Sequence, residues 1–423
     1  MAVLLTNGTY IDAATLSFTK THILAGEDAE GGISFLDEIP VGNHHIVLDC
    51  TGRYITHAFA NGHHHAYSAL ARGMGAPRKT PADFNEILQY IWWTLDKSLD
   101  EDMIRSSALV TALACAKNGV TFVIDHHASP FAVEGSLEII AEAFESVGLG
   151  HLLCYEISDR DGMEIARKGL RETETYLSRR QGLVGLHASF TVGNETLRQA
   201  VDLARQTNSG IHMHVAEDVS DESHCLENYH TWVIDRLAQA GVLEFPKTIL
   251  AHCLHLDEYE RRQLSGSPAW VVQNMESNLN NSVGLFNSKG LGDRIMLGTD
   301  GMHSDMLRSA KAAFFSGKNH DDIDYAETYR RFRNAGNYLK ENGFTGYGEN
   351  NLVVIDYDSP TPFNKENFYG HFLFGLEARH IQHVIAQGKL IVRNGQVITV
   401  NEEEILQEAR RQAARLWKKM QQS

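Results

Sequence analysis

The chain has 423 residues, 43% of them hydrophobic, with 54 acidic and 38 basic residues and a formal net charge of −16. This composition can bury a large core without disulfides. The acidic balance and the lack of any long Lys/Arg run argue against nucleic acid or an anionic membrane surface as the main partner. Five widely spaced cysteines without a CxxC pair are typical of a reduced intracellular protein. The start lacks the basic region of a signal peptide, and no apolar stretch approaches the ~18 residues of a membrane span, so we expect a cytoplasmic protein.

The first fifty residues predict short strands separated by turns. Asn7-Gly8 predicts a hairpin between strands at 3–5 and 10–11, and residues 46–48 predict a further strand.

Residues 54–341 alternate apolar strands with helical patterns such as 102–117 and 136–147. Strands that are apolar on both faces and followed by helices indicate a parallel sheet wrapped by helices. Eight such units close into a TIM barrel, an α/β fold. The stretch 67–102 is expected to add a helix or lid. The expected strands are 55–60, 120–125, 151–155, 183–190, 210–216, 248–253, 269–274 and 294–299.

Strands return without intervening helices after residue 350. They are expected at 352–357, 383–392 and 397–400, with Asn394-Gly395 as a tight hairpin. A final helix is expected from Asn401, with Glu404 in the capping-box position. We expect residues 1–54 and 350–423 to form a β-sandwich with this helix attached, and residues 55–349 to form the barrel.

Candidate metal ligands lie at the ends of expected strands. His63 and His65 follow the first barrel strand, and side chains two residues apart on an extended backbone point the same way. A surface histidine cluster is the competing interpretation of this pair alone. His214 and Asp300 end strands five and eight, and all strand ends of a barrel meet at one mouth. Three imidazoles and one carboxylate suit zinc, with iron or manganese as alternatives.

Other polar residues at the same mouth are candidates for chemistry. Glu217 lies three residues after His214, where a carboxylate can accept a proton from water and pass it on, although a helix N-terminus also favours a carboxylate. His252 ends strand six and can polarise a carbonyl or orient water. His187 in strand four is expected to contact substrate. Residues 182–197 contain no lysine that could bridge two metals, which favours a single ion.

Motifs along most of the chain resemble the amidohydrolase superfamily, in its mononuclear cytosine/guanine-deaminase and chlorohydrolase-like branch, and most of all the SsnA-type aminohydrolases. The resembling stretches, in order, are 61–74 (NGHHHAYSALARGM), 92–96 (WWTLD), 123–130 (VIDHHASP), 186–192 (LHASFTV), 212–218 (HMHVAED), 277–281 (SNLNN), 298–301 (GTDG) and 357–362 (YDSPTP).

This resemblance implies a barrel flanked by a β-sandwich from both termini. It assigns His63, His65, His214 and Asp300 as ligands of the metal, Glu217 as proton shuttle and His252 as a neighbour of the reacting water. It places Asn278 and nearby Asn and Glu residues beside the substrate.

The chain departs from the family pattern at Thr56-His57-Ala58, Met275-Glu276 and His303. The last two lie at the expected pocket, so the substrate need not be the family's usual one. Expected substrate contacts are His187, Glu276, Asn278, Trp92 and His303.

The leading hypothesis is hydrolytic deamination of a purine- or pyrimidine-like heterocycle with Glu217, His252 and Asp300 as catalytic residues. The alternatives are hydrolysis of a cyclic amide or another C–N bond at the same site, or a metal-binding protein without catalysis. We expect a small-molecule substrate and a homo-oligomer, most simply a dimer, with Trp92-Trp93 or the C-terminal helix as candidate interfaces.

Overall fold

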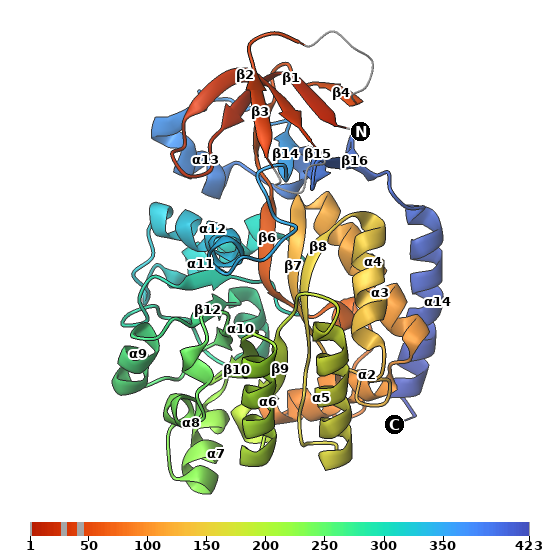
Figure 1. Cartoon of the computed structure of the whole chain (residues 1–423), viewed down its shortest axis with the longest axis vertical. Coiled ribbons are helices and arrows are strands. Elements are labelled where there is room, and N and C mark those ends of the chain that lie inside the picture. Colours follow the sequence, from red (N-terminus) through yellow and green to blue (C-terminus); the bar gives the residue numbers. More distant parts are fainter. Residues whose placement is uncertain (1, 27–31, 40–45, 423) are drawn as a thin grey trace.

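The computed structural model describes residues 2–26, 32–39 and 46–422. A sheet built from both terminal segments lies at one end of a larger body of alternating strands and helices (Figure 1). Among the described residues, no helix combines the length and apolar character that a membrane span requires.

Eight parallel strands form the centre of the larger body. Strands β6, β7 and β8 pair in one sheet, and β9 to β13 pair in sequence order in another. Parallel bridges between Leu153 and Gly182 and between His64 and Asp300 join the edges of these two sheets. The order around the ring is therefore β6 to β13, which confirms the predicted α/β barrel. The strands are β6 (Phe59–His64), β7 (Val120–His127), β8 (Gly150–Tyr155), β9 (Val184–Ala188), β10 (Ile211–Val215), β11 (Ile249–His252), β12 (Trp270–Gln273) and β13 (Ile295–Leu297).

Helices cover the outside of this ring and turn apolar stripes toward it, as amphipathic helices do around a parallel sheet. They are α3 (Glu101–Lys117), α4 (Ser136–Val147), α5 (Met163–Leu177), α6 (Asn194–Gln206), α7 (Val219–Tyr229), α8 (Val233–Gln239), α9 (Glu258–Ser265), α11 (Met306–Gly317) and α12 (Tyr325–Glu341). The short helix α10 (Met275–Asn281) lies instead at the mouth of the ring.

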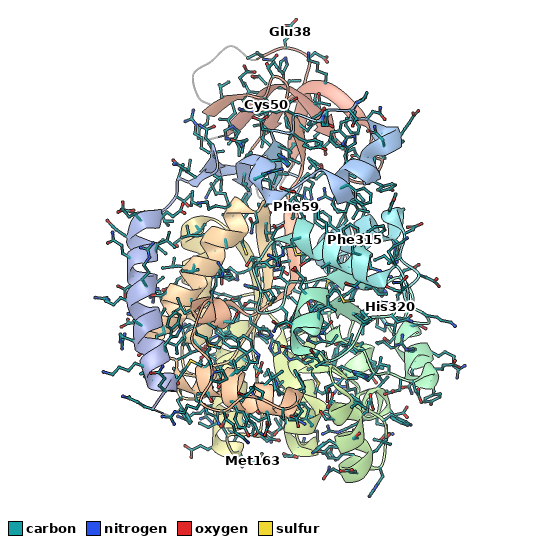
Figure 2. All side chains as sticks on the ribbon, turned by 180° about the vertical axis from the view of Figure 1, so that it is seen from behind. Glu38, Cys50, Phe59, Met163, Phe315 and His320 are labelled. Atoms are coloured by element: carbon teal, nitrogen blue, oxygen red, sulfur yellow. The ribbon has the colours of Figure 1, made fainter. Side chains whose placement is uncertain are left out.

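The first predicted barrel strand, 55–60, is wrong in its boundaries. β5 (Tyr54–His57) pairs with β1 and β14 of the terminal sheet, and the barrel strand β6 begins only at Phe59. The N–H of Ala58 donates to Asn351, whereas the N–H of Phe59 donates to Gly119, beside β7. The chain thus changes sheets between adjacent residues, and Phe59 marks the junction in Figure 2.

Strands from both ends of the chain form one sheet of nine strands that includes β5. Its core is a separate cluster of buried side chains such as Val3, Ile55 and Leu352. The division at residues 54 and 350 stays a prediction. The other strands are β1 (Val3–Ile11), β2 (Phe18–Ala25), β3 (Ile33–Leu36), β4 (Ile46–Asp49), β14 (Leu352–Ile355), β15 (Ile381–Ala386), β16 (Lys389–Arg393) and β17 (Gln396–Val397).

One turn prediction and one strand prediction in this sheet are wrong, and one turn prediction is confirmed. β1 runs through Asn7-Gly8, where a bulge with Asn7 at φ 60° replaces the predicted hairpin. The predicted strand 383–392 is two strands, because Gln387 and Gly388 turn the chain at φ 49° and 75°. Asn394-Gly395 forms the predicted hairpin between β16 and β17, with φ 50° and 72° as a type I′ turn requires.

The segments between strands add helices that the sequence placed only in part. A helix, α13 (Phe368–Phe374), lies between β14 and β15, so the prediction of strands without intervening helices is wrong. The predicted extra helical stretch after β6 is confirmed. It comprises the 3₁₀ turn η1 (Ala66–Ala71), α1 (Phe84–Ile87), the π-helical turn η2 (Leu88–Trp92) and α2 (Trp93–Ser98).

The predicted final helix is α14 (Glu402–Met420), which runs along the side of the barrel from the terminal sheet to α2 (Figure 1). Its apolar stripe packs on the barrel core, and Trp417 Nε1 donates to Leu70 O at 2.8 Å. This stripe is therefore occupied within the chain and is not a free interface.

We expect Asn401→Ala to lower the free energy of unfolding by about 0.5–2 kcal/mol, the usual effect of removing an N-cap. The Asn401 side chain accepts a hydrogen bond from the Glu404 N–H, a donor with no partner inside the helix. Denaturant unfolding measures the change, with Arg410→Ala on the exposed face of the same helix as control. Equal stability of the two variants would contradict a capping role.

Candidate metal centre and active site

The carboxyl ends of the barrel strands bring the four predicted metal ligands together. One ligand atom from each of His63, His65, His214 and Asp300 lies within 4.8 Å of the others, and all four residues are buried. Asp300 reaches the cluster because its N–H and that of Thr299 both donate to His63 O, which ties the end of β13 to β6.

Hydrogen bonds at the outer ring nitrogens fix two of the imidazoles. Nδ1 of His65 lies 2.6 Å from His126 O, and Nδ1 of His214 lies 3.0 Å from His187 O. A carbonyl accepts only, so each Nδ1 carries the proton and each Nε2 of a neutral ring turns a lone pair inward. This is the arrangement in which a histidine serves as a metal ligand.

The inner nitrogens converge on one point. The two inward atoms, His65 Nε2 and His214 Nε2, are 3.1 Å apart, and His63 Nε2 is buried without a hydrogen bond. Two nitrogens bound tetrahedrally to one zinc at about 2.0–2.1 Å lie about 3.3 Å apart, so the observed spacing fits a shared cation. Burial opposes protonation of His65, yet the adjacent Asp300 carboxylate raises the pKa of His65 to about 9. The cluster thus favours a positive charge at its centre.

Backbone strain is concentrated at the same mouth. Ala216, His252 and Asp300 have φ of 45°, 74° and 52°, in the left-handed region that non-glycine residues rarely adopt. Such conformations cost about 1–3 kcal/mol each and persist where surrounding contacts enforce them, often at functional sites.

Glu217 lies beside the cluster rather than in it. Its Oε2 is 3.5 Å from His252 Nε2, and its Oε1 accepts from Asn281 Nδ2 at 3.4 Å. Burial raises the pKa of Glu217 well above its ordinary value, and the negative charge of Asp300 adds to the shift. The structure therefore places next to the four ligands a carboxyl group that readily holds a proton.

His252 is oriented from behind by Asn278. The Asn278 amide Nδ2 donates to His252 Nδ1 at 2.8 Å, and burial lowers the pKa of His252 to about 4. The neutral ring then carries its proton on Nε2, which makes no hydrogen bond and lies 3.7 Å from Asp300 Oδ2. His252 thus presents an N–H donor to the centre of the mouth.

A cavity of about 60 Å³ opens onto the cluster. Its polar side includes His187 and Glu217, and its apolar side comes from the helical stretch after β6. The main apolar lining residues are Tyr67, Phe84, Leu88, Trp92 and Trp93. Trp92 and His187 therefore lie where the sequence placed substrate contacts, whereas Asn278 lies behind His252.

Besides Asn278, two further predicted substrate contacts, Glu276 and His303, are not part of the lining of this cavity. Glu276 Oε1 accepts from Arg308 Nε at 2.7 Å, and Glu276 Oε2 lies 2.5 Å from His303 Nε2. The Glu276 carboxylate is thus bound by His303 and by Arg308 of α11. The prediction that Glu276 and His303 face the substrate is not supported.

The sequence analysis missed Glu156, a buried residue that lines the cavity. Its Oε2 lies 3.2 Å from His126 Nδ1 and its Oε1 lies 4.0 Å from His187 Nε2. Burial opposes ionisation, but the positive charge that His187 and His126 can carry lowers the pKa of Glu156 well below its ordinary value. The signal was present, since Glu156 directly follows the strand that ends at Tyr155, as His214 and Asp300 end theirs.

The chain is similar over most of its length to curated deaminases. It is 28% identical over 396 residues to a 5-methylthioadenosine/S-adenosylhomocysteine deaminase of Pelotomaculum thermopropionicum, which covers 87% of each chain. It is 25% identical to a 5'-deoxyadenosine deaminase of Methanocaldococcus jannaschii, over 86% of this chain and 89% of that one.

Solved structures share the fold. An adenosine deaminase from Xanthomonas campestris with bound zinc superposes with a TM-score of 0.82 at 18% identity, covering 98% of both chains. The zinc complex of the atrazine chlorohydrolase TrzN from Arthrobacter aurescens gives 0.81 at 15% identity, over 97% of this chain and 100% of that one. The family model described as "Amidohydrolase family" matches residues 54–331, more than half of the chain. The predicted resemblance is therefore confirmed, and the chain belongs to the amidohydrolase family.

Proposed function

We propose that the protein is a metal-dependent hydrolase that removes an amino group from a purine- or pyrimidine-like heterocycle. The observation that carries this proposal is the half-buried Glu217 carboxyl group beside the His63, His65, His214 and Asp300 cluster, at the edge of a cavity with aromatic side chains on its apolar side. A site that only stored a metal would have no need of a proton-holding carboxyl group. The names of the two curated relatives given above, both deaminases of adenosine-like compounds, agree with this reaction.

His63, His65, His214 and Asp300 are proposed to hold one divalent cation. Zinc is the first candidate, because three imidazoles and one carboxylate suit it and two neighbouring structures contain it, with iron or manganese as alternatives. When bound, such a cation lowers the pKa of a water molecule to about 7. The residues around it then control where the water and its protons go.

Glu217 is proposed to carry the proton between water and substrate. Water adds to the ring carbon that bears the amino group, and one of its protons passes to the Glu217 carboxylate. Glu217 then delivers this proton to the substrate nitrogen, so that the amine leaves as ammonia. The products are the oxo ring and ammonia, which balances the addition of one water.

His252 is proposed to stabilise the negative charge that develops on the attacking oxygen, and Asp300 is proposed to contribute by holding the cation beside that oxygen. The Nε2–H of His252 points toward the space between Glu217 and Asp300, 3.5 and 3.7 Å from their carboxylate oxygens. A donor held rigidly at that place is most effective when its target becomes more negative.

We expect Asn278→Ala to lower kcat by about 10–100-fold while metal content stays the same, as is typical when an outer partner of a site is lost. Without the amide donor, His252 is free to place its proton on Nδ1 and to lose the inward N–H. Steady-state kinetics and metal analysis test this, with the exposed Asn228→Ala on α7 as control. An unchanged kcat would remove His252 orientation from the mechanism.

The reaction itself is tested by ammonia release from aminated heterocycles with the zinc-loaded protein. Ring opening of cyclic amides without ammonia release from any amine would replace the deaminase with the alternative C–N hydrolase. Binding of metal with turnover of neither class would favour the non-catalytic alternative.

We also propose a cytoplasmic homodimer. The five cysteines are all free and buried, as suits a reducing compartment. The half-buried Trp92 and Trp93 line the cavity, and the apolar stripe of α14 is covered, so neither predicted interface is free. Sedimentation equilibrium tests the dimer, and a monomer at micromolar concentration would contradict it.

A further inference from the structure

The polar residues of the mouth separate into two groups around the ring of strands. Glu217, His252 and Asp300 follow β10, β11 and β13, and their ligand atoms lie within 4.8 Å of one another. Glu156 and His187 come from β8 and β9, on the other arc of the ring, and form a cluster with His214. The proposed mechanism uses the first group and leaves Glu156 without a role.

One oxygen of Glu156 is committed to the protein and the other is available. His126 Nε2 lies 3.1 and 3.2 Å from the carbonyls of Leu186 and His212, so this nitrogen carries a proton. His126 Nδ1 lies 3.2 Å from Glu156 Oε2, within ion-pair distance. Oε1 takes no part in this contact and keeps its lone pairs as an acceptor at the wall of the cavity.

No donor among the described residues hydrogen-bonds to this acceptor. The nearest ring nitrogen, His187 Nε2, is 4.0 Å from Oε1, beyond hydrogen-bond range. A buried acceptor without a donor is costly, and a ligand that supplies an N–H removes that cost. The part of the cavity wall formed by Glu156 thus selects for a donor.

The cavity also limits size. At about 60 Å³ it holds about four to six water molecules, each of which needs about 10–15 Å³ of such volume. This is the scale of a bare ring system, and the aromatic side chains of Tyr67, Trp92 and Trp93 provide walls for its faces.

We propose that the substrate is a bare nitrogen heterocycle whose ring N–H donates to Glu156 Oε1, at the edge away from the amino group that leaves. This inference rests on the proposed function and narrows it. It sets the chain apart from its curated relatives, whose names are those of nucleoside-type compounds in which a ring nitrogen bears a sugar. A substituent on that ring nitrogen removes the N–H that would donate to Glu156 and also makes the ligand larger.

The test compares adenine, guanine and cytosine with their ring-N-methyl derivatives and their nucleosides on the zinc-loaded wild-type protein. A charge-assisted hydrogen bond predicts that the N–H form of the active ring has a kcat/KM about 10–100-fold above its N-methyl form. Equal or better turnover of the N-methyl base or the nucleoside overturns the inference and leaves the deaminase proposal intact.

Variants of Glu156 separate the effect of the hydrogen bond on substrate preference from the effect of substrate size. Glu156→Ala should lose most of the preference, because activity on the N–H base falls while activity on the N-methyl base changes little. Glu156→Gln, which keeps the shape, covers the case in which the alanine variant fails to fold, and it should show a reduced preference. Glu172→Gln is the matched control, since Glu172 is a buried carboxylate that accepts from Gly135 and Leu137 N–H outside the cavity. A preference that persists in both Glu156 variants contradicts the assignment.

Binding distinguishes failure of this inference from failure of the proposed function. If no ring releases ammonia, the deaminase proposal fails, and calorimetry with the same pairs still tests the contact. The contact with Glu156 is supported if the wild type binds N–H rings more tightly than N-methyl rings and the Glu156 variants do not. The contact is ruled out if the wild type binds N–H and N-methyl rings equally tightly, or binds neither.

Discussion

Glu217→Gln is expected to lower turnover by at least ~10²-fold, the low end for loss of a general acid–base group, while fold and metal content are retained. Glutamine has nearly the same shape and keeps the hydrogen bond with Asn281, but it cannot take up or deliver a proton. Burial and Asp300 raise the pKa of Glu217 well above its ordinary value, which suits a group that must hold a proton between two steps. Single-turnover ammonia release measures the effect on the chemical step.

Glu222→Gln is the matched control for this variant. Glu222 is also buried and lies five residues further along, and burial followed by the charge of Glu260 raises its pKa to about 9. At pH 7 it is therefore already neutral, and glutamine replaces it with little change of charge. We expect near-normal turnover for Glu222→Gln. A Glu217→Gln enzyme with a near-normal rate would contradict the mechanism, and one that lacks metal would make Glu217 a ligand.

The sequence predicts which residues form the His63, His65, His214 and Asp300 cluster because their signal is local. A histidine or carboxylate at the end of a barrel strand must lie at the mouth, whichever helices surround it. His214 and Asp300 followed from that rule alone. The outer hydrogen bonds that turn His65 and His214 inward were not predictable, since their acceptors are backbone carbonyls on neighbouring strands.

Glu276 shows where adjacency in sequence misleads. It belongs to α10, where Ser277, Asn280 and Asn281 line the cavity at the i, i+3, i+4 spacing of one helix face. Glu276 lies at the edge of that face and meets Arg308 and His303 instead. The helix and its rotation were not predicted, because a seven-residue helix carries too little periodicity to be recognised.

The junction of the two sheets shows a second limit. Residues 54–64 are extended almost throughout, so their pattern predicts one strand, yet Ala58 divides it between two sheets. Only the partners, Asn351 on one side and Gly119 on the other, determine the division. These partners lie 293 and 60 residues away, beyond what a local pattern can contain.

Asp300→Ala is expected to lower metal affinity by more than the ~10–100-fold typical of outer partners, and to reduce turnover to background. Asp300 supplies the only carboxylate of the proposed four ligands, and its Oδ1 lies 3.1 Å from His65 Nε2. Its loss leaves three imidazoles with no negative charge to offset that of a divalent ion. Elemental analysis after dialysis, together with ammonia release before and after added zinc, measures both effects.

Comparison with Glu217→Gln makes this result specific. Both variants should lose activity, but only Asp300→Ala should lose metal, so metal content separates a ligand from a proton carrier. His303→Ala serves as control for a histidine at the end of the same strand that lies outside the cluster, and it should retain about one ion per chain.

The wild type is likewise expected to hold about one tightly bound ion, because strand four has no lysine to bridge a second. Full metal content in Asp300→Ala would exclude Asp300 as a ligand, and two well-occupied ions in the wild type would instead draw Glu156, His126 and His187 into metal binding.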